Sequence, residues 1–188
     1  MKYNTFTGMP LIPYRIIRAL IDNENFWKLL YYPTYDALSK ENLTTKQKMS
    51  LIWQGQEHME DYYIFLTNIQ PDMELKARTL LKCYRYVTQP VNPVIATVVY
   101  RFDFLFGSTI PLVEYEGITC NRGDLLEMEM MKSLNGKDVA GVGYLQYNRQ
   151  LSRYCSSEVG IGNNYTYTGL SVVMATEFTD SGDVITCE

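Results

Sequence analysis

The side chain best suited to acid–base chemistry in this sequence is His58, the only histidine of the chain. It stands between Glu57 and Glu60, and a histidine beside carboxylates can serve as a general base near neutral pH. Such a base needs a nucleophile to activate, but the chain has neither a G-x-S-x-G elbow nor an H-E-x-x-H pair. We therefore predict a surface histidine near a helix end, and we predict no catalytic residue.

Paired carboxylates are the next candidates for chemistry. Glu127 and Glu129 lie two positions apart on a predicted helix, so they point in different directions and do not form the facing pair of a glycosidase. Glu114 and Glu116 fall in a long connection, where carboxylates usually act as solvated charge or in subunit contacts. The run DSGD at residues 180–183 has only part of the spacing of a calcium-binding loop. No metal site is predicted.

Two G-x-G triplets, at residues 141–143 and 160–162, lack the third glycine of a dinucleotide-binding loop. The first precedes a predicted strand and the second lies in a hairpin connection, so both are predicted to be turns. Met128, Met130 and Met131 belong to one predicted helix, where they fill the core or form an adaptable docking face. No cofactor is predicted.

The four cysteines, Cys83, Cys120, Cys155 and Cys187, are widely and evenly spread along the chain. None of their spacings fits a zinc knuckle or a C-x-x-C redox pair. We predict free, at least partly buried thiols in a reducing compartment, and disulfide bridges are the alternative.

Composition excludes several classes of protein. The chain has 17 Lys and Arg against 21 Asp and Glu, a net charge of -4, and no long basic run. This balance speaks against sequence-specific DNA binding, which needs a basic surface, but it would let DNA slide past without sticking. No apolar run is long enough to cross a membrane, and no secretory leader precedes Pro10, so a soluble protein of cytoplasmic origin is expected.

Tyrosine is unusually frequent, with 16 residues in a chain of 188. A tyrosine has an apolar ring and a polar tip, which suits a surface that becomes half-buried on association. This richness favours a subunit of an assembly.

The spacing of apolar residues predicts helices first and a sheet afterwards. Residues 1–60 are predicted to form an N-terminal helical arm, residues 61–179 an α+β domain, and residues 180–188 a flexible tail. The domain is predicted to be an antiparallel sheet of about four strands with one packed helix. The four strands are expected at residues 76–87, 94–106, 142–148 and 165–178.

Local signals mark the helix ends. The main helix is expected over residues 121–134, with Asn121 as its N-cap and Asn135-Gly136 as its left-handed stop. Thr44 or Thr45 is expected to cap a shorter helix. The connection at residues 107–117 is long enough to be a projecting loop or a hairpin.

The C-terminal half of the chain resembles bacteriophage head–tail junction and tail-end proteins of the tail-terminator or tail-completion kind. The resemblance lies in the order of a strand, a helix that stops at Leu-Asn-Gly, a Gly-x-Gly strand and a final Tyr-x-Gly strand. An N-terminal aromatic run is also similar to proteins of such phages. The matching segments are YRFDFLF (residues 100–106), KSLNG (132–136), GVGYLQY (141–147), YTGLSV (167–172) and NFWKLLYYP (25–33).

This resemblance implies a virion structural protein and no enzyme. Such a protein would assemble with itself as a ring of six or twelve copies, between portal, adaptor, neck or tail-tube proteins. The genomic DNA would pass through the ring without sequence-specific binding, and no membrane would be involved. Because the helical arm at residues 13–32 is longer than a terminator needs, a neck, adaptor or ring protein is an open alternative. A small adaptor for another virion or host protein, or a hydrolase that uses His58, are the rival functions.

Overall fold

The computed structural model describes residues 9–69, 78–91, 95–107, 109–148 and 167–179, and the predicted tail at residues 180–188 lies outside them. Helices and a sheet pack together in an α+β fold, as the sequence predicts. The helices are α1 (Ile12–Ala19), α2 (Glu24–Tyr31), α3 (Thr45–Ser50) and α4 (Arg122–Leu134). The strands are β1 (Ile64–Phe65), β2 (Thr79–Pro90), β3 (Ile95–Gly107), β4 (Leu112–Tyr115), β5 (Ile118–Asn121), β6 (Lys137–Val139), β7 (Gly143–Tyr147) and β8 (Tyr167–Thr179).

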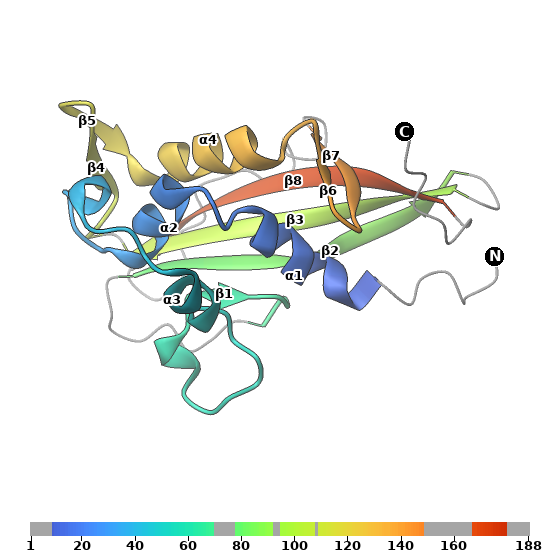
Figure 1. The fold of residues 1–188 in the computed structure, drawn as a ribbon, viewed down its shortest axis with the longest axis horizontal. Coiled ribbons are helices and arrows are strands. Elements are labelled where there is room, and N and C mark those ends of the chain that lie inside the picture. Colours follow the sequence, from blue (N-terminus) through green and yellow to red (C-terminus); the bar gives the residue numbers. More distant parts are fainter. Residues whose placement is uncertain (1–8, 70–77, 92–94, 108, 149–166, 180–188) are drawn as a thin grey trace.

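Six strands form one curled sheet in the order β1-β2-β3-β8-β7-β6 (Figure 1). The long strands β2, β3 and β8 are antiparallel neighbours, whereas β1 runs parallel to β2. The sheet is therefore mixed and larger than the four antiparallel strands that we predicted. The two added strands, β1 and β6, have two and three residues, too few to show the alternation by which a strand is recognised in a sequence.

The long strands have two different faces, because successive side chains of a strand point to opposite sides. One face consists of apolar and aromatic side chains that are fully buried, among them Cys83, Tyr100, Phe102 and Phe104. The helices α1, α2 and α4 cover this face (Figure 1). We call it the helix-covered face. The other one is called the open face because α1, α2 and α4 do not lie on it, although side chains such as Leu80, Val99 and Val173 are buried there as well.

The N-terminal helices share the hydrophobic core of the sheet. Ile12, Phe26 and Trp27 are fully buried, and the ring of Phe26 meets that of Phe104 edge-on at a centroid distance of 6.3 Å. Trp27 Nε1 donates a hydrogen bond to the carbonyl of Leu20 at 2.8 Å. The described part of the predicted arm thus packs on the sheet, since the apolar stripe of each helix needs a surface that covers it.

The helix ends lie where local signals predict them. The side chain of Asn121 accepts a hydrogen bond from Gly123 N at 2.7 Å, and Gly136 has a φ of +68° just after α4. Thr44 and Gln47 form a reciprocal capping box at the start of α3. These interactions join residues only a few positions apart, which is why the sequence alone predicts them.

The connection between β3 and α4 contains the hairpin β4–β5, one of the two forms that we predicted. Glu116 and Gly117 form its turn with φ values of +52° and +78°, as a type I′ turn requires. The hairpin stands at one end of the molecule, beside the start of α4 (Figure 1). It forms a separate sheet of two strands.

Candidate interaction surfaces

His58 lies on the surface, just before a short 3₁₀ helix at Met59–Asp61. Its side chain is 74% exposed, and its Nδ1 lies 3.1 Å from Oε1 of Glu60. Among the residues that the structure describes, Glu60 is the hydrogen-bond partner of the ring. No hydroxyl or thiol nucleophile in that part of the chain is bonded to His58.

The two glutamates of α4 have different surroundings. Glu129 is buried, and its Oε1 accepts a hydrogen bond from Lys132 Nζ at 3.0 Å. Glu127 is half-buried, and its pKa is raised by burial and by the neighbouring charge of Asp124. As the helical spacing predicts, the two carboxylates do not form a facing pair.

The first G-x-G triplet is a turn, as predicted. Gly141, between β6 and β7, has a φ of +72°, and Gly143, the first residue of β7, has a φ of +89°. The Gly141 carbonyl accepts a hydrogen bond from Arg15 Nη1 at 2.8 Å. The second triplet, at residues 160–162, and the acidic run at residues 180–183 lie outside the described residues.

Cys83 and Cys120 are free thiols, in agreement with the prediction. Cys83 is fully buried, and burial raises the pKa of its thiol well above the usual range, so it is not a reactive thiolate. Cys120 is half-buried on β5. Cys155 and Cys187 lie outside the described residues.

The methionines of α4 serve as core. Met130 is fully buried, and Met128 and Met131 pack against the same cluster. Over the described ranges of the chain, no three metal-binding side chains come together, and no helix has the length and apolar character to span a membrane.

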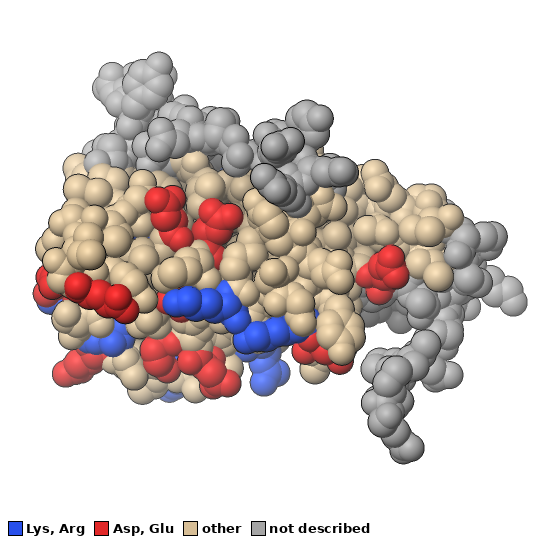
Figure 2. Space-filling view, turned by 90° about the horizontal axis from the view of Figure 1, so that it is seen from above, with Lys and Arg blue, Asp and Glu red and all other residues tan. Residues whose placement is uncertain are grey.

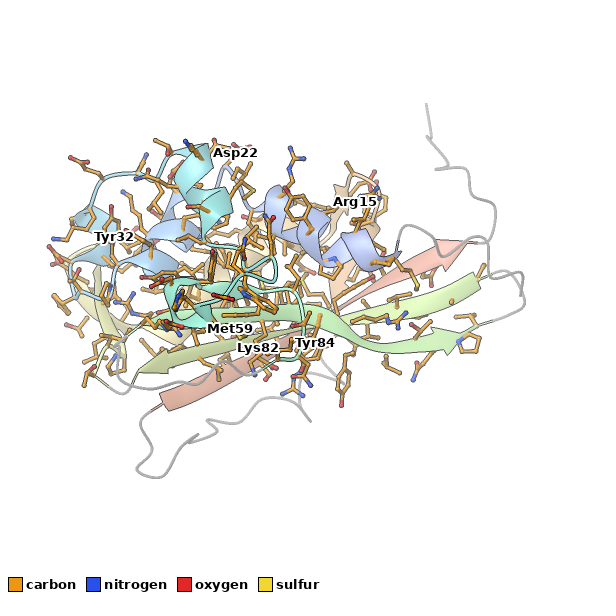
Figure 3. The ribbon with its side chains drawn as sticks, turned by 90° about the horizontal axis from the view of Figure 1, so that it is seen from below. Arg15, Asp22, Tyr32, Met59, Lys82 and Tyr84 are labelled. Atoms are coloured by element: carbon orange, nitrogen blue, oxygen red, sulfur yellow. The ribbon has the colours of Figure 1, made fainter. Side chains whose placement is uncertain are left out.

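The open face of the sheet holds a polar cluster that the sequence analysis does not identify. Asp103 is its centre: Oδ2 accepts a hydrogen bond from Tyr84 Oη at 2.9 Å, and Oδ1 accepts one from Arg101 Nε at 2.6 Å. Ser171 Oγ also donates to Oδ1 and accepts from Arg101 Nη2 at 2.9 Å. We call these four residues the Asp103 cluster. Figure 3 shows Lys82 and Tyr84 on the side of the sheet away from α1 and α2.

The Asp103 cluster fastens three strands together. Asp103 lies opposite Lys82 of β2 and Ser171 of β8 in the sheet register. Burial and the bond to Asp103 raise the pKa of Tyr84, and burial lowers the pKa of Lys82. Because both oxygens of Asp103 already accept hydrogen bonds, this carboxylate is suited to a structural role more than to proton abstraction. Arg101 and Asp103 stand two positions apart in a strand, and that spacing could have identified the cluster.

Arg122 is a second feature that the sequence analysis misses. It is the first residue of α4 and is fully buried, and burial lowers its pKa to about 10. Its guanidinium donates hydrogen bonds of 2.7–2.9 Å to the carbonyls of Leu29, Tyr32, Thr34 and Ile110. Arg122 therefore ties the end of α2 and the segment after it to the start of α4.

The β4–β5 hairpin exposes two large apolar side chains, since Leu112 is 50% and Ile118 is 66% exposed. It is anchored on one side by Glu114 N, which donates to the carbonyl of Tyr35 at 2.9 Å. Tyr35 Oη lies 2.7 Å from Thr119 Oγ1 on the other strand. The hairpin is thus held in place while its apolar side chains face solvent, which is typical of a contact surface.

A polar hollow of about 610 Å³ lies where the end of α1, the start of α2, the last turn of α4 and β6 meet. Asp22, Glu24, Lys137 and Asp138 are its charged lining residues. Oε1 of Glu24 is 2.6 Å from Nζ of the buried Lys48. Charges of both signs therefore border this hollow.

A comparison with protein families relates the chain to one of them. The model of the YomW family matches residues 23–176, from the start of α2 through most of β8. The chain belongs to the YomW family. YomW is a name given to a phage-derived protein of the Bacillus SPbeta type. Comparison with curated proteins and with solved structures gives no match.

Proposed function

We propose that this YomW-family chain is a structural subunit of a phage virion that forms an oligomeric ring at the neck or at the head-proximal end of the tail. The ring would join head and tail around the DNA channel. Its neighbours in this proposal are portal, adaptor, neck or tail-tube proteins, and its location is the virion, after assembly in the host cytoplasm. The phage origin of the family supports this proposal.

The observation that carries the proposal is the β4–β5 hairpin. It stands apart from the main sheet and leaves Leu112 and Ile118 exposed. Exposed apolar surface on an anchored projection has no benefit for an isolated subunit, whereas a contact with another subunit buries it and gains free energy. A ring subunit needs such a surface on each copy.

The core shared by the helices and the sheet gives further support. Arg122 joins α2 to the start of α4, and the packing of Phe26 on Phe104 joins α2 to the sheet, so these elements keep one arrangement. A ring closes only if every copy repeats the same rotation relative to its neighbour, and a rigid subunit meets that requirement. The net charge of -4 suits a wall past which DNA slides.

An adaptor for another virion or host protein is the second candidate. It is favoured by the exposed tyrosines, since Tyr35 and Tyr86 are each 48% and Tyr144 is 64% exposed. An adaptor would bind a portal or tail-tube subunit as a monomer. Capture of such a subunit by a chain that stays monomeric would favour this candidate over the ring.

Light scattering of the purified chain tests the ring directly. We expect a mass of several subunits, and a stable monomer at high concentration contradicts the ring. Cryo-electron microscopy of the intact particle would then locate the chain along the particle axis. His58→Ala addresses the hydrolase alternative, and unchanged assembly and infectivity of this variant would argue against it.

A further inference from the structure

One end of the molecule, formed by the β4–β5 hairpin and the first half of α4, is acidic. Glu114, Glu116 and Asp124 are exposed there, and Glu127 is half-buried. Between residues 109 and 131 the only basic residue is Arg122, which is buried against backbone carbonyls. This stretch of the chain therefore presents only negative charge to solvent.

Four cations gather near the other end of α4. Arg15 and Arg18 belong to α1, Lys132 to the last turn of α4 and Lys137 to β6, and these elements pack against one another. We call these four residues the cation strip. Figure 2 shows blue side chains close together near the middle of one face of the molecule, with red side chains on either side.

Two members of the cation strip are available for a new contact. Arg15 already donates to the Gly141 carbonyl, and Lys132 already pairs with Glu129. Arg18 and Lys137 are exposed, and neither forms an ion pair within the described ranges. They are the cations that a partner with negative charge would meet first.

The order of these patches along α4 determines which kind of contact they favour. Asp124 of the acidic end lies in the first turn of α4 and the cation strip lies at its last turn. In the same chain, Glu129 and, with it, Glu116 of the hairpin raise the pKa of Lys132. A copy shifted along α4 brings its hairpin to the strip of its neighbour. A two-fold contact in which each patch meets itself would bring like charges together, which is unfavourable, whereas an antiparallel pair that joins the acidic end of each copy to the strip of the other would pair opposite charges. The charge pattern thus favours contacts between the acidic end of one copy and the cation strip of another, and such contacts generate rings when they repeat head to tail.

We infer that the β4–β5 hairpin of one copy docks on the cation strip of a second copy of the same chain. Glu114 and Glu116 face Arg18 and Lys137 in this contact, and Ile118 becomes buried. This inference rests on the proposed function, because it names the two surfaces through which ring subunits meet.

Acidic residues beside the cation strip limit where the hairpin can dock and lower the affinity of the contact. Asp22 and Asp138 line the hollow beside Lys137 and have the same charge as the hairpin glutamates. They oppose any placement of the hairpin over the hollow itself. Asp22→Asn with Asp138→Asn is expected to tighten self-association several-fold, and weaker or unchanged association contradicts the inferred contact.

The decisive experiment uses two charge-reversed variants. The hairpin variant has Glu114→Lys and Glu116→Lys, and the strip variant has Arg18→Glu and Lys137→Glu. Alone, each variant places like charges in the contact, so its self-association measured by analytical ultracentrifugation is expected to weaken at least about tenfold. In a 1:1 mixture, the reversed hairpin meets the reversed strip and the native hairpin meets the native strip, so assembly is expected to return.

A matched control reverses two exposed charges elsewhere, with Lys46→Glu and Glu57→Lys, and is expected to assemble like the unmodified chain. Circular dichroism and thermal unfolding check that every variant is folded. If the unmodified chain assembles and both charge-reversed variants assemble equally well, the inferred contact is wrong and the ring remains. If the unmodified chain is a stable monomer, the proposed function fails as well. A mixture that does not recover assembly also overturns the inferred contact.

Discussion

The two faces of the long strands are stabilised in different ways, although both are formed by the same strands, whose successive residues point to one face and then the other. On the helix-covered face, Phe102, Phe104 and Tyr100 pack as a continuous apolar layer. On the open face, the Asp103 cluster separates two small apolar groups. These groups are Phe65, Leu80 and Leu105 on one side and Val99 and Val173 on the other.

This difference shows how one strand can serve two kinds of surface. The helix-covered face is stabilised by close packing, because its side chains fit against those of α1, α2 and α4. The open face depends on hydrogen bonds that join β2, β3 and β8 across Asp103. Substitutions on the two faces should therefore lower the free energy of unfolding for different reasons.

The largest expected effect is on the helix-covered face. Phe104→Ala removes a fully buried ring that contacts Phe26, and it should lower the free energy of unfolding by about 3–5 kcal/mol. Leu105→Ala, one position on, truncates a side chain of the small apolar group on the open face and should have the smaller effect, about 2–3 kcal/mol. Urea unfolding followed by tryptophan fluorescence measures both. A larger loss for Leu105→Ala would reverse the ranking of the two faces.

The second effect is on the open face. Asp103→Ala leaves the donors of Tyr84, Arg101 and Ser171 without their acceptor, and it should lower the free energy of unfolding by about 2–3 kcal/mol. Asp103→Asn keeps one acceptor oxygen and should lose less. Thr97→Ala, on the same face of β3, is the control and should have little effect. An Asp103→Ala variant as stable as the control would mean that the hydrogen bonds contribute nothing net.

The sequence predicts those parts of the fold that depend on near neighbours. The alternation of the long strands, the cap at Asn121 and the turn after α4 arise from residues a few positions apart, and the structure confirms them. Residues 62–66 are β-prone in sequence, but the predicted sheet does not count β1 within them as a strand, and β6 is not predicted. Both are so short that they depend on pairing with β2 and β7. The packing of the N-terminal helices on the sheet likewise depends on surfaces that are distant in sequence.

The candidate surfaces divide in the same way. The carboxylates of the β4–β5 hairpin were predictable as surface charge in a projecting connection. The role of Arg122 was not, since its guanidinium bonds Leu29, which lies 93 positions away. The Asp103 cluster is intermediate: Arg101 and Asp103 share a face by their spacing, but Ser171 joins them only through the pairing of β3 with β8.

The third effect concerns alkaline pH and the helix-covered face. Burial raises the pKa of the Cys83 thiol above its ordinary value of 9.0, so the folded protein keeps this thiol neutral while the unfolded chain ionises it. The contribution to stability is therefore complete below pH 9 and is lost as the pH rises. Cys83→Ala should remove up to about 1.4 kcal/mol per pH unit from the alkaline slope of the free energy of unfolding.

Urea unfolding at several values between pH 8 and pH 11 measures this slope. Val98→Ala truncates a buried, non-titrating residue of the same face, so it should lower stability at every pH and leave the slope unchanged. A slope that is the same with and without Cys83 would show that the thiol does not contribute to alkaline unfolding.

The smallest effect compares one chemical change on both faces. Tyr100 Oη is buried and has no hydrogen-bond partner in the part of the chain that the structure describes, whereas Tyr84 Oη donates to Asp103 at 2.9 Å. Tyr100→Phe therefore removes an unpaired buried hydroxyl and should raise the free energy of unfolding by about 1 kcal/mol, and Tyr84→Phe should lower it by about 1 kcal/mol. Both variants lose a single oxygen atom, so their difference in urea midpoint isolates the value of the partner. Changes of opposite sign in the free energy of unfolding would support the view that the helix-covered face is stabilised by packing and the open face by hydrogen bonds. A loss of stability in both variants would mean that the Tyr100 hydroxyl also has a polar partner on the helix-covered face.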